Sequence, residues 1–208
     1  MNNKPIKNKF CTIYLVRHGV TDWNIEGKIQ GNTDIPLNTE GKIQAKELAK
    51  ELKHIKFDKA LSSDLLRAKQ TAEIIAKEHE LLVETTEVLR ERNFGYLEGK
   101  SSDLVKDMQR LIGSLEEDKR FSYKYHPSIE SDGEIAERLL TLIREVAVAN
   151  SGKNVLVVTH GGVIRVLSIK MGLFTHADDV KVRNLAYLKF DCDGSDIVIR
   201  DIKGIEKL

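Results

Sequence analysis

Two histidines in this sequence stand directly after a short apolar run and directly before a glycine. His18 follows residues 12–16 and Arg17, and His160 follows residues 154–159. In open α/β sheets, ligands bind outside the carboxyl ends of the strands, often against helix N-termini. A single such histidine more often has a structural role, in which backbone hydrogen bonds satisfy its ring, than a functional one. Two in the same topological position favour one shared site.

Two arginines stand where they could hold an anion beside these histidines. Arg17 comes at the end of a buried run and should have a charged or hydrogen-bonding partner there. Arg67 falls in the first turn of an expected helix, where a cation opposes the helix dipole unless an anion is held at the same end. The alternative for Arg67 is a solvated side chain on a surface helix. Because guanidinium groups bind phosphate bidentately, the two arginines and two histidines predict a phosphoryl-binding pocket.

Transfer of a phosphoryl group to a histidine nitrogen also needs an acid that protonates the departing alcohol. The segment "LRERNFGYLEGK" supplies two candidates, Glu91 and Glu98. A carboxyl in this role gives a proton in the first step and accepts one from water in the second. The alternative for Glu91, which stands between Arg90 and Arg92, is a surface ion pair.

The composition is that of an ordinary globular protein. The length of 208 residues predicts one domain over 1–208. The 33 Lys and Arg residues nearly cancel the 32 Asp and Glu residues, which argues against a nucleic-acid or acidic-membrane binder. The polar N-terminus does not resemble a signal peptide, and no apolar stretch is long enough to span a membrane. We therefore expect a cytoplasmic protein.

The cysteines do not predict a metal or disulfide framework. The sequence has only Cys11 and Cys192, which are far apart and lack partners at metal-ligand spacing. We expect both thiols to stay reduced.

Short apolar or β-branched runs alternate with amphipathic segments along the chain. Strands are expected at residues 12–16, 58–63, 81–89, 154–159, 185–191 and 195–202. Helices are expected at residues 38–55, 63–79, 134–149 and 162–173. This alternation predicts an α/β fold, a three-layer α/β/α sandwich with a mostly parallel sheet. The last two strands predict an antiparallel hairpin at the edge.

Local signals mark two helix starts and one irregular region. Ser62 or Ser63 is expected to begin the second helix, and Ser131–Glu134 forms a capping box before the third. Residues 100–130 are the least regular stretch and predict a cap-like insertion. The edge hairpin could pair between subunits, so a homodimer is possible.

Five segments resemble one known family. They are "LVRHGVTDWN", "GKIQGNTDIPLNTEG", "SSDLLRAKQTAE", "LRERNFGYLEG" and "VVTHGGVIR", in the order and spacing of the histidine phosphatase superfamily, with its phosphoglycerate mutase-like fold. The resemblance runs from about residue 12 to about residue 168. It implies that His18 is the nucleophile that becomes phosphohistidine. It also implies that Glu91, in the E-R-x-x-G position, is the proton donor ahead of Glu98, and that no metal or other cofactor takes part.

The resemblance also implies which residues bind the phosphoryl group. Those expected to do so are Arg17, Asn24, Gln30, Gly31, Arg67 and His160, and we add Gly161 at the start of the helix after His160. A catalytically dead phosphate-binding module would lack one of the essential residues, and this sequence keeps them all.

The resemblance leaves the reaction open between a phosphatase and a mutase. Cofactor-dependent mutases carry a longer insertion with paired arginines, whereas Lys119–Arg120 is the only adjacent basic pair between residues 100 and 150 here. A lysine of the mutase pocket falls on Ser102 by motif spacing. We therefore favour a phosphatase for a small phosphorylated metabolite, such as a sugar phosphate. A cofactor-dependent phosphoglycerate mutase, or an α-ribazole-phosphate or phosphoserine phosphatase, remains the alternative.

The expected cap carries the candidates for substrate selection. These candidates are Lys119, Arg120, Lys124, Tyr125 and His126, and the alternative for this stretch is a solvated loop. Ser128 and Ile129 also stand where family members often have two glycines, which predicts a differently shaped loop and substrate preference.

Overall fold

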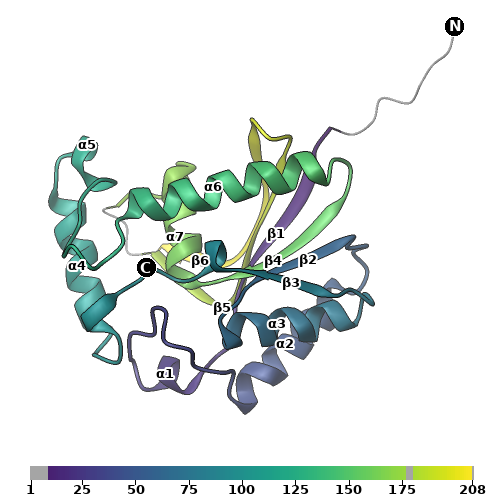
Figure 1. The fold of residues 1–208 in the computed structure, drawn as a ribbon, viewed down its shortest axis with the longest axis horizontal. Helices are drawn as coiled ribbons and strands as arrows, with labels where there is room; N and C mark the ends of the chain where they lie inside the picture. Colours follow the sequence, from purple (N-terminus) through teal and green to yellow (C-terminus); the bar gives the residue numbers. More distant parts are fainter. Residues whose placement is uncertain (1–8, 177–179, 208) are drawn as a thin grey trace, which may run out of the picture.

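The computed structural model describes residues 9–176 and 180–207. Within them, six strands form one sheet in the order β3-β2-β4-β1-β5-β6 (Figure 1). The strands are β1 (Cys11–Arg17), β2 (Lys59–Ser63), β3 (Val83–Thr86), β4 (Asn154–Thr159), β5 (Val180–Cys192) and β6 (Ile197–Lys207). The first four are parallel, β5 runs antiparallel to β1, and β6 antiparallel to β5. The predicted mostly parallel sheet with an antiparallel edge is confirmed.

Helices cover both faces of this sheet, which confirms the three-layer sandwich (Figure 1). Helices α2 (Thr39–Leu52) and α3 (Leu66–Lys77) pack on one face, and α6 (Asp132–Ala149) and α7 (Gly161–Lys170) on the other. Shorter elements lie in the connections: α1 (Asp22–Ile25), η1 (Glu87–Leu89), η2 (Gly95–Leu97), α4 (Asp103–Ser114) and α5 (Glu117–Arg120). In the described part of the chain, no helix combines the length and the apolar character needed to cross a membrane.

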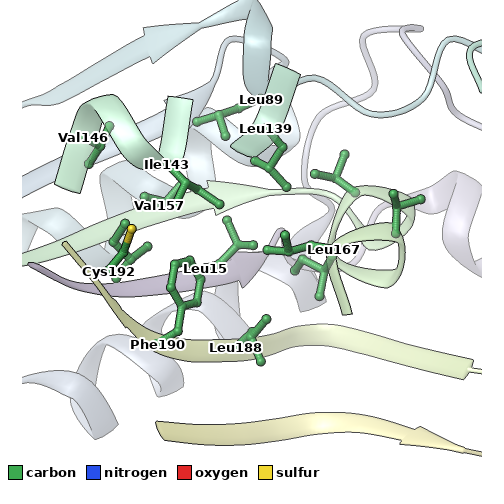
Figure 2. Close-up of a cluster of buried hydrophobic side chains, with 14 of the residues drawn as sticks. Leu15, Leu89, Leu139, Ile143, Val146, Val157, Leu167, Leu188, Phe190 and Cys192 are labelled. Carbon is green, nitrogen blue, oxygen red and sulfur yellow. The ribbon is translucent and has the colours of Figure 1, made fainter. Parts of the chain in front are cut away.

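Strand β1 is apolar on both faces because both faces are covered. Ile13 and Leu15 belong to the cluster under α6 and α7, whereas Tyr14 and Val16 belong to the cluster under α2 and α3. Figure 2 shows Leu15 within the first of these clusters. Full burial of each such side chain contributes about 1.5–3 kcal/mol. This burial holds β1 in the middle of the sheet, so polar residues are tolerated only where the strand ends.

The register of β1 and β4 brings the two predicted histidines together. Arg17 stands opposite Thr159, and the backbone N–H of His18 donates to the Thr159 carbonyl over 3.0 Å. Strands β1 and β4 therefore end at the same level of the sheet, and His18 and His160 lie side by side at its carboxyl edge.

The start of α3 differs from the prediction that Ser62 or Ser63 begins it. Both serines lie in β2, which stays paired through Ser63. Leu65 occupies the N-cap position, and the Asp34 carboxylate accepts from the Leu66 N–H over 2.7 Å. The prediction was wrong because the cap comes from a loop distant in sequence.

The strand predicted over residues 81–89 is shorter than expected. Strand β3 ends at Thr86, whose hydroxyl accepts from the Val88 N–H over 3.3 Å and begins η1. Leu82 is exposed and does not belong to the strand. The apolar residues that flank β3 in the sequence therefore made the predicted strand too long.

The two cysteines are neighbours although they are far apart in sequence. Cys11 on β1 stands opposite Cys192 on β5, and both are buried free thiols. Burial, with a smaller effect of Cys192, raises the pKa of Cys11 to about 12. The thiol therefore stays protonated at neutral pH, and a protonated thiol is a poor nucleophile.

Residues 100–130, which we call the cap, contain α4 and α5 and stand to one side of the sandwich near the start of α6 (Figure 1). Met108, Ile112 and Ile129 are buried in a small cluster of their own together with Phe94. This small core is separate from the two clusters that flank the sheet.

Candidate active site

The predicted site residues gather round one cavity of about 260 Å³ at the carboxyl ends of β1 and β4. The predicted residues in its lining are Arg17, His18, Asn24, Gln30, Gly31, Arg67, Glu91 and Gly161. His160 is fully buried, and its ring centroid lies 5.2 Å from that of His18. The structure thus brings all of them to one place, although they come from five separate segments.

His18 directs one ring nitrogen to a backbone acceptor and keeps the other available. Its Nδ1 lies 2.7 Å from the Gly19 carbonyl oxygen, which can only accept, so Nδ1 carries the proton and Nε2 keeps its lone pair. Burial, followed by the charges of Arg67 and Arg17, lowers the pKa of His18 well below 6.5. The ring is therefore neutral at pH 7 and its Nε2 is a competent nucleophile.

His160 has the same electrostatic surroundings. Burial comes first, then the charge of Arg67, and together they lower its pKa well below 6.5. Neither ring nitrogen has a hydrogen-bond partner among the residues that the structure describes. A buried polar atom left unpaired costs about 1–3 kcal/mol, so these nitrogens mark a place where a polar ligand is stabilised.

Arg67 is a fully buried cation held by backbone carbonyls. Its Nη1 donates to Thr33 over 2.9 Å and its Nη2 to Gly31 over 2.6 Å, while Nε has no partner within residues 9–176 and 180–207. Burial lowers the pKa of Arg67 to about 10, against the raising effect of Glu91, so the group stays charged at pH 7. Because carbonyl dipoles rather than a carboxylate hold it, its charge remains available to an anion.

Arg17 lies against the first turn of α7. Its Nη1 donates to the Val182 carbonyl over 2.5 Å. A Cβ at Gly161 would lie 3.1 Å from the Arg17 Nε, so glycine at this position gives the guanidinium room. The N-terminus of α7 and the two arginines therefore concentrate positive charge at one end of the cavity.

Asn24, Gln30 and Gly31 line the same cavity from the loop after β1. The Asn24 Oδ1 accepts from the N–H and hydroxyl of Thr21, each over 3.1 Å, which leaves the amide nitrogen as the donor for a ligand. Gln30 is buried, and its Oε1 has no partner in the described structure. Gly31 has φ of +53°, and a Cβ there would lie 2.1 Å from Glu98 Oε1.

The two candidate acids have different surroundings. Glu91 stands at the cavity wall, where Oε1 accepts from the Arg92 N–H over 2.8 Å and Oε2 from the Gly162 N–H over 3.0 Å. Glu98 instead accepts from the N–H and hydroxyl of Thr33 over 3.0 and 2.6 Å, which fixes the loop that holds Arg67. Geometry therefore favours Glu91 as the proton donor.

A buried charge network at the cavity was missed by the sequence analysis. Asp132, the first residue of α6, is 1% exposed and pairs with Arg92, with His176 over 3.1 Å and with Arg165 over 3.9 Å. Burial alone would raise the pKa of Asp132, but Arg92, His176 and Arg165 together hold it well below its usual range. Arg92 and Arg165 also line the cavity. The capping box at Ser131 was the only signal here, and it indicated structure alone.

One face of α4 forms part of the cavity wall. Ser102, Val105, Lys106 and Gln109 line it at the i, i+3, i+4, i+7 spacing of a single helix face. This i, i+3, i+4, i+7 spacing is a signal that the sequence alone contains.

The cap residues expected to select the substrate lie elsewhere. Lys119 pairs with Glu116, Arg120 donates to the Leu115 carbonyl over 2.9 Å, and Lys124 pairs with Glu134. Tyr125 and His126 are exposed. The structure favours the solvated-loop alternative for this stretch, because its charges are satisfied locally.

A neighbouring cavity of about 390 Å³ shares Glu91. Its cations are already paired, Arg138 with Glu130 over 2.6 Å and Lys124 with Glu134 over 2.7 Å. The histidine cavity is therefore the better candidate for an anionic ligand. Among the described residues, no three His, Cys, Asp or Glu side chains are grouped closely enough to hold a metal ion.

The cavity combines a neutral nucleophilic nitrogen, the buried guanidinium group of Arg67, the partly buried one of Arg17, a helix N-terminus and a carboxyl group. Guanidinium groups and a helix N-terminus bind the non-bridging oxygens of a phosphoryl group, and the nitrogen can attack its phosphorus. Fold and site together define the chemistry of a phosphoryl-transfer enzyme.

Comparison with known proteins agrees with this class. The family model of the histidine phosphatase superfamily, branch 1, matches residues 13–203, and the chain belongs to this family.

Relatives in this family carry both phosphatase and mutase names. A Bacillus subtilis protein named uncharacterized phosphatase PhoE is 37% identical over 155 residues, covering 74% of each chain. The probable phosphoglycerate mutase GpmB of Escherichia fergusonii is 34% identical over 185 residues, covering 86% of this chain and 84% of its own. The crystal structure of phosphoserine phosphatase from Entamoeba histolytica, in complex with 3-phosphoglyceric acid, has a TM-score of 0.74 at 27% identity. It covers 93% of this chain and 96% of that one.

Proposed function

We propose that this protein is a metal-independent phosphatase that hydrolyses small phosphomonoesters through a phosphohistidine at His18. One observation carries the proposal. The Nδ1 of His18 is committed to the Gly19 carbonyl, so the neutral ring keeps its Nε2 lone pair at a cavity that Arg17 and the buried Arg67 also line. A buried histidine with a purely structural role would use its polar atoms for hydrogen bonds rather than direct one at a cationic cavity.

In the first step, Arg17, Arg67 and His160 bind the non-bridging oxygens of the substrate phosphate. The Nε2 of His18 attacks phosphorus in line with the ester oxygen, and the P–O bond breaks as the P–N bond forms. Glu91 gives its proton to the departing alkoxide, so the alcohol leaves neutral. The arginine charges stabilise the transition state, in which negative charge spreads over the phosphoryl oxygens.

In the second step, water replaces the alcohol. Glu91, now ionised, accepts a proton from the water as its oxygen attacks phosphorus. The P–N bond breaks, inorganic phosphate forms, and His18 regains its neutral ring. One carboxyl group therefore serves as acid and then as base.

The cap supports a phosphatase over a mutase. A mutase must hold its substrate while the phosphoryl group returns to it, and this needs cations that bind the rest of the substrate. Here Ser102 lines the cavity where a mutase lysine would stand, and both Lys119 and Arg120 are engaged by neighbours within the cap. With Lys119 and Arg120 engaged in this way, the cap supports release of the alcohol and entry of water.

The shape and lining of the cavity support a small polar substrate. Besides the predicted site residues, the lining includes Lys28, Phe94, Val105, Lys106 and Gln109. Side chains with hydrogen-bond donors beside apolar ones suit a hydroxylated carbon skeleton, as in a sugar phosphate.

The test is phosphate release from a panel of sugar phosphates, phosphoserine, α-ribazole phosphate and phosphoglycerates, measured with and without EDTA. We expect release of inorganic phosphate from at least one class, unchanged by EDTA. Conversion of 3- to 2-phosphoglycerate in the presence of the bisphosphate, without net release, would instead establish the mutase. Loss of activity in EDTA would contradict metal independence.

A further inference from the structure

Strand β5 is irregular at the point where it passes the active site. Its pairing register with β6 shifts between Val182 and Tyr187. Within this bulge, Leu185 has φ of +59°, a left-handed conformation that is unfavourable for a leucine. The one other non-glycine residue with positive φ among the described residues is Glu80, which lies just after α3, where left-handed residues commonly end helices.

The bulge is built into the neighbouring structure. The Leu185 side chain is buried in the cluster between the sheet and α2 and α3. On β6, Gly204 has φ of +69°, and a Cβ there would lie 3.1 Å from that of Ala186. The cluster that holds Leu185 and the glycine at position 204 on β6 therefore both fit the bulge. This indicates a fixed feature of the fold rather than a loosely paired strand end.

The bulge directs polar groups at three residues of the site. The Val182 carbonyl accepts from Arg17. The Asn184 Nδ2 donates to the His18 carbonyl over 3.0 Å and also lies 3.4 Å from the Asn24 Oδ1. Because both of these oxygens are acceptors here, the nitrogen of the Asn184 amide must face them, and each of its two hydrogens has a partner.

We propose that Asn184 is a positioning residue for phosphoryl transfer. This inference rests on the proposed phosphatase function. One amide group joins the backbone of the nucleophile to the side chain of Asn24, so the two are held in a fixed relation. The bulge at Leu185 turns Asn184 toward them, out of the regular pleat of β5. The strained backbone is the structural consequence of placing this side chain there.

The position of Asn184 restricts what it can do. It contacts the backbone oxygen of His18 and not the ring, and so it acts through His18 and Asn24. Its loss would misalign the attack on phosphorus. A misplacement of about 1 Å costs on the order of a hundredfold in rate. Because the histidine nitrogen and the phosphorus that it attacks are the same for every substrate, the loss should not depend on which alcohol leaves.

The test uses Asn184→Asp, which keeps the shape but removes both donors, and Asn184→Ala. Each is assayed with p-nitrophenyl phosphate, whose leaving group departs without protonation, and with β-glycerol phosphate, whose leaving group needs a proton. We expect kcat to fall by about tenfold to a hundredfold on both substrates, by more than KM rises. With Asn24→Ala as the second change, the effects should be non-additive, because both residues act in one unit.

Glu80→Gly is the matched control, since it relieves the other described left-handed residue at an exposed place far from the site. We expect it to leave kcat unchanged. If Asn184→Asp and Asn184→Ala fold poorly, Asn184→Ser, which is smaller and keeps a hydroxyl donor, replaces them and should show a smaller loss in the same pattern.

Folded Asn184 variants with kcat within twofold of wild type would overturn the proposal. Additivity with Asn24→Ala, or a loss confined to β-glycerol phosphate, would overturn it too. Wild-type protein inactive on both substrates would instead contradict the proposed function. An active wild type with unaffected variants would contradict only the role of Asn184.

Discussion

The carboxyl edge of the sheet and the cap both line the cavity, but they hold their charged groups in opposite ways. At the edge, Arg67 is fully buried and bonded to backbone carbonyls. In the cap, Lys106 is about 60% exposed and pairs with Asp103 over 2.8 Å, one turn away on α4. The edge thus presents uncompensated charge in a fixed geometry, and the cap presents compensated charge on flexible side chains.

This difference assigns different tasks to the two regions. Catalysis depends on preorganised charges, which cost no reorganisation when the transition state forms. Exposed ion pairs contribute only about 0–1 kcal/mol, so the cap can exchange them for contacts with a substrate at little cost. We therefore expect changes at the edge to lower the rate of chemistry and changes on α4 to alter substrate preference.

The largest expected effect is at Glu91. Glu91→Gln removes the proton donor, so kcat for β-glycerol phosphate should fall by about 10²–10⁴-fold. The loss should be much smaller for p-nitrophenyl phosphate, because its leaving group needs no proton. Glu98→Gln is the matched control, and it should change thermal stability without this dependence on leaving group. Equal losses on both substrates in Glu91→Gln would break the assignment of the acid.

The next effect contrasts a buried arginine of the edge with an exposed one of the cap. Arg67→Lys keeps the charge but loses the planar fork, so kcat/KM should fall by about 10²–10³-fold. Arg110→Lys, in an exposed pair with Asp107 on α4, should change it less than twofold. Similar effects at the two positions, measured by steady-state kinetics on one substrate, would remove the distinction between the regions.

A third prediction concerns pH and stability. His18 and His160 have folded-state pKa values well below 6.5, so both stay neutral in the folded protein while they become protonated in the unfolded chain. Stability from this source is present above pH 6.5 and is lost as pH falls. Each ring should lower the free energy of unfolding by about 1.4 kcal/mol per pH unit below 6.5.

Urea unfolding between pH 7.5 and 5.5 measures this slope, and His18→Gln is the matched variant. In that variant the free energy of unfolding should depend less steeply on pH, because one of the two histidines no longer contributes to the slope. An identical slope in wild type and variant would show that the ring at residue 18 titrates alike in the folded and unfolded chains.

The smallest effect is expected in the cap. Lys106→Ala and Gln109→Ala should each change KM for a given phosphomonoester by only a few fold, because solvent screens exposed charges. Neither change should affect kcat appreciably. The measurement is the ranking of kcat/KM over a substrate panel. Lys119→Ala, whose side chain pairs with Glu116, is the control and should leave the ranking unchanged. A change in ranking for Lys119→Ala alone would move substrate selection to the solvated loop.

The sequence predicted the edge of the sheet well because its signals are local. Apolar runs that end in histidine and glycine define where strands stop, and parallel strands stop at the same edge, so His18 and His160 could be placed together. Arg67 was found because a cation in the first turn of a helix is unfavourable without a ligand.

The features that were missed depend on contacts between distant segments or on irregular backbone. The Asp34 cap of α3 and the Asp132 network involve partners that no local pattern links. Asn184, which contacts His18, lies where the pairing of β5 with β6 is irregular, and the sequence there resembles an ordinary strand of the hairpin. The face of α4 was predictable from its spacing, but the basic stretch after it was the more conspicuous signal.

The proposed mechanism requires that His18 carries the phosphoryl group. The most direct measurement is to mix the protein with a ³²P-labelled phosphomonoester that it hydrolyses, quench during turnover, and map the labelled peptide by mass spectrometry. The phosphoryl group on a histidine nitrogen should be lost in acid and kept in base. We predict label on the peptide that contains His18 in wild-type protein and none in His18→Ala. Label retained in His18→Ala, or turnover in wild type without any labelled histidine, would contradict the account.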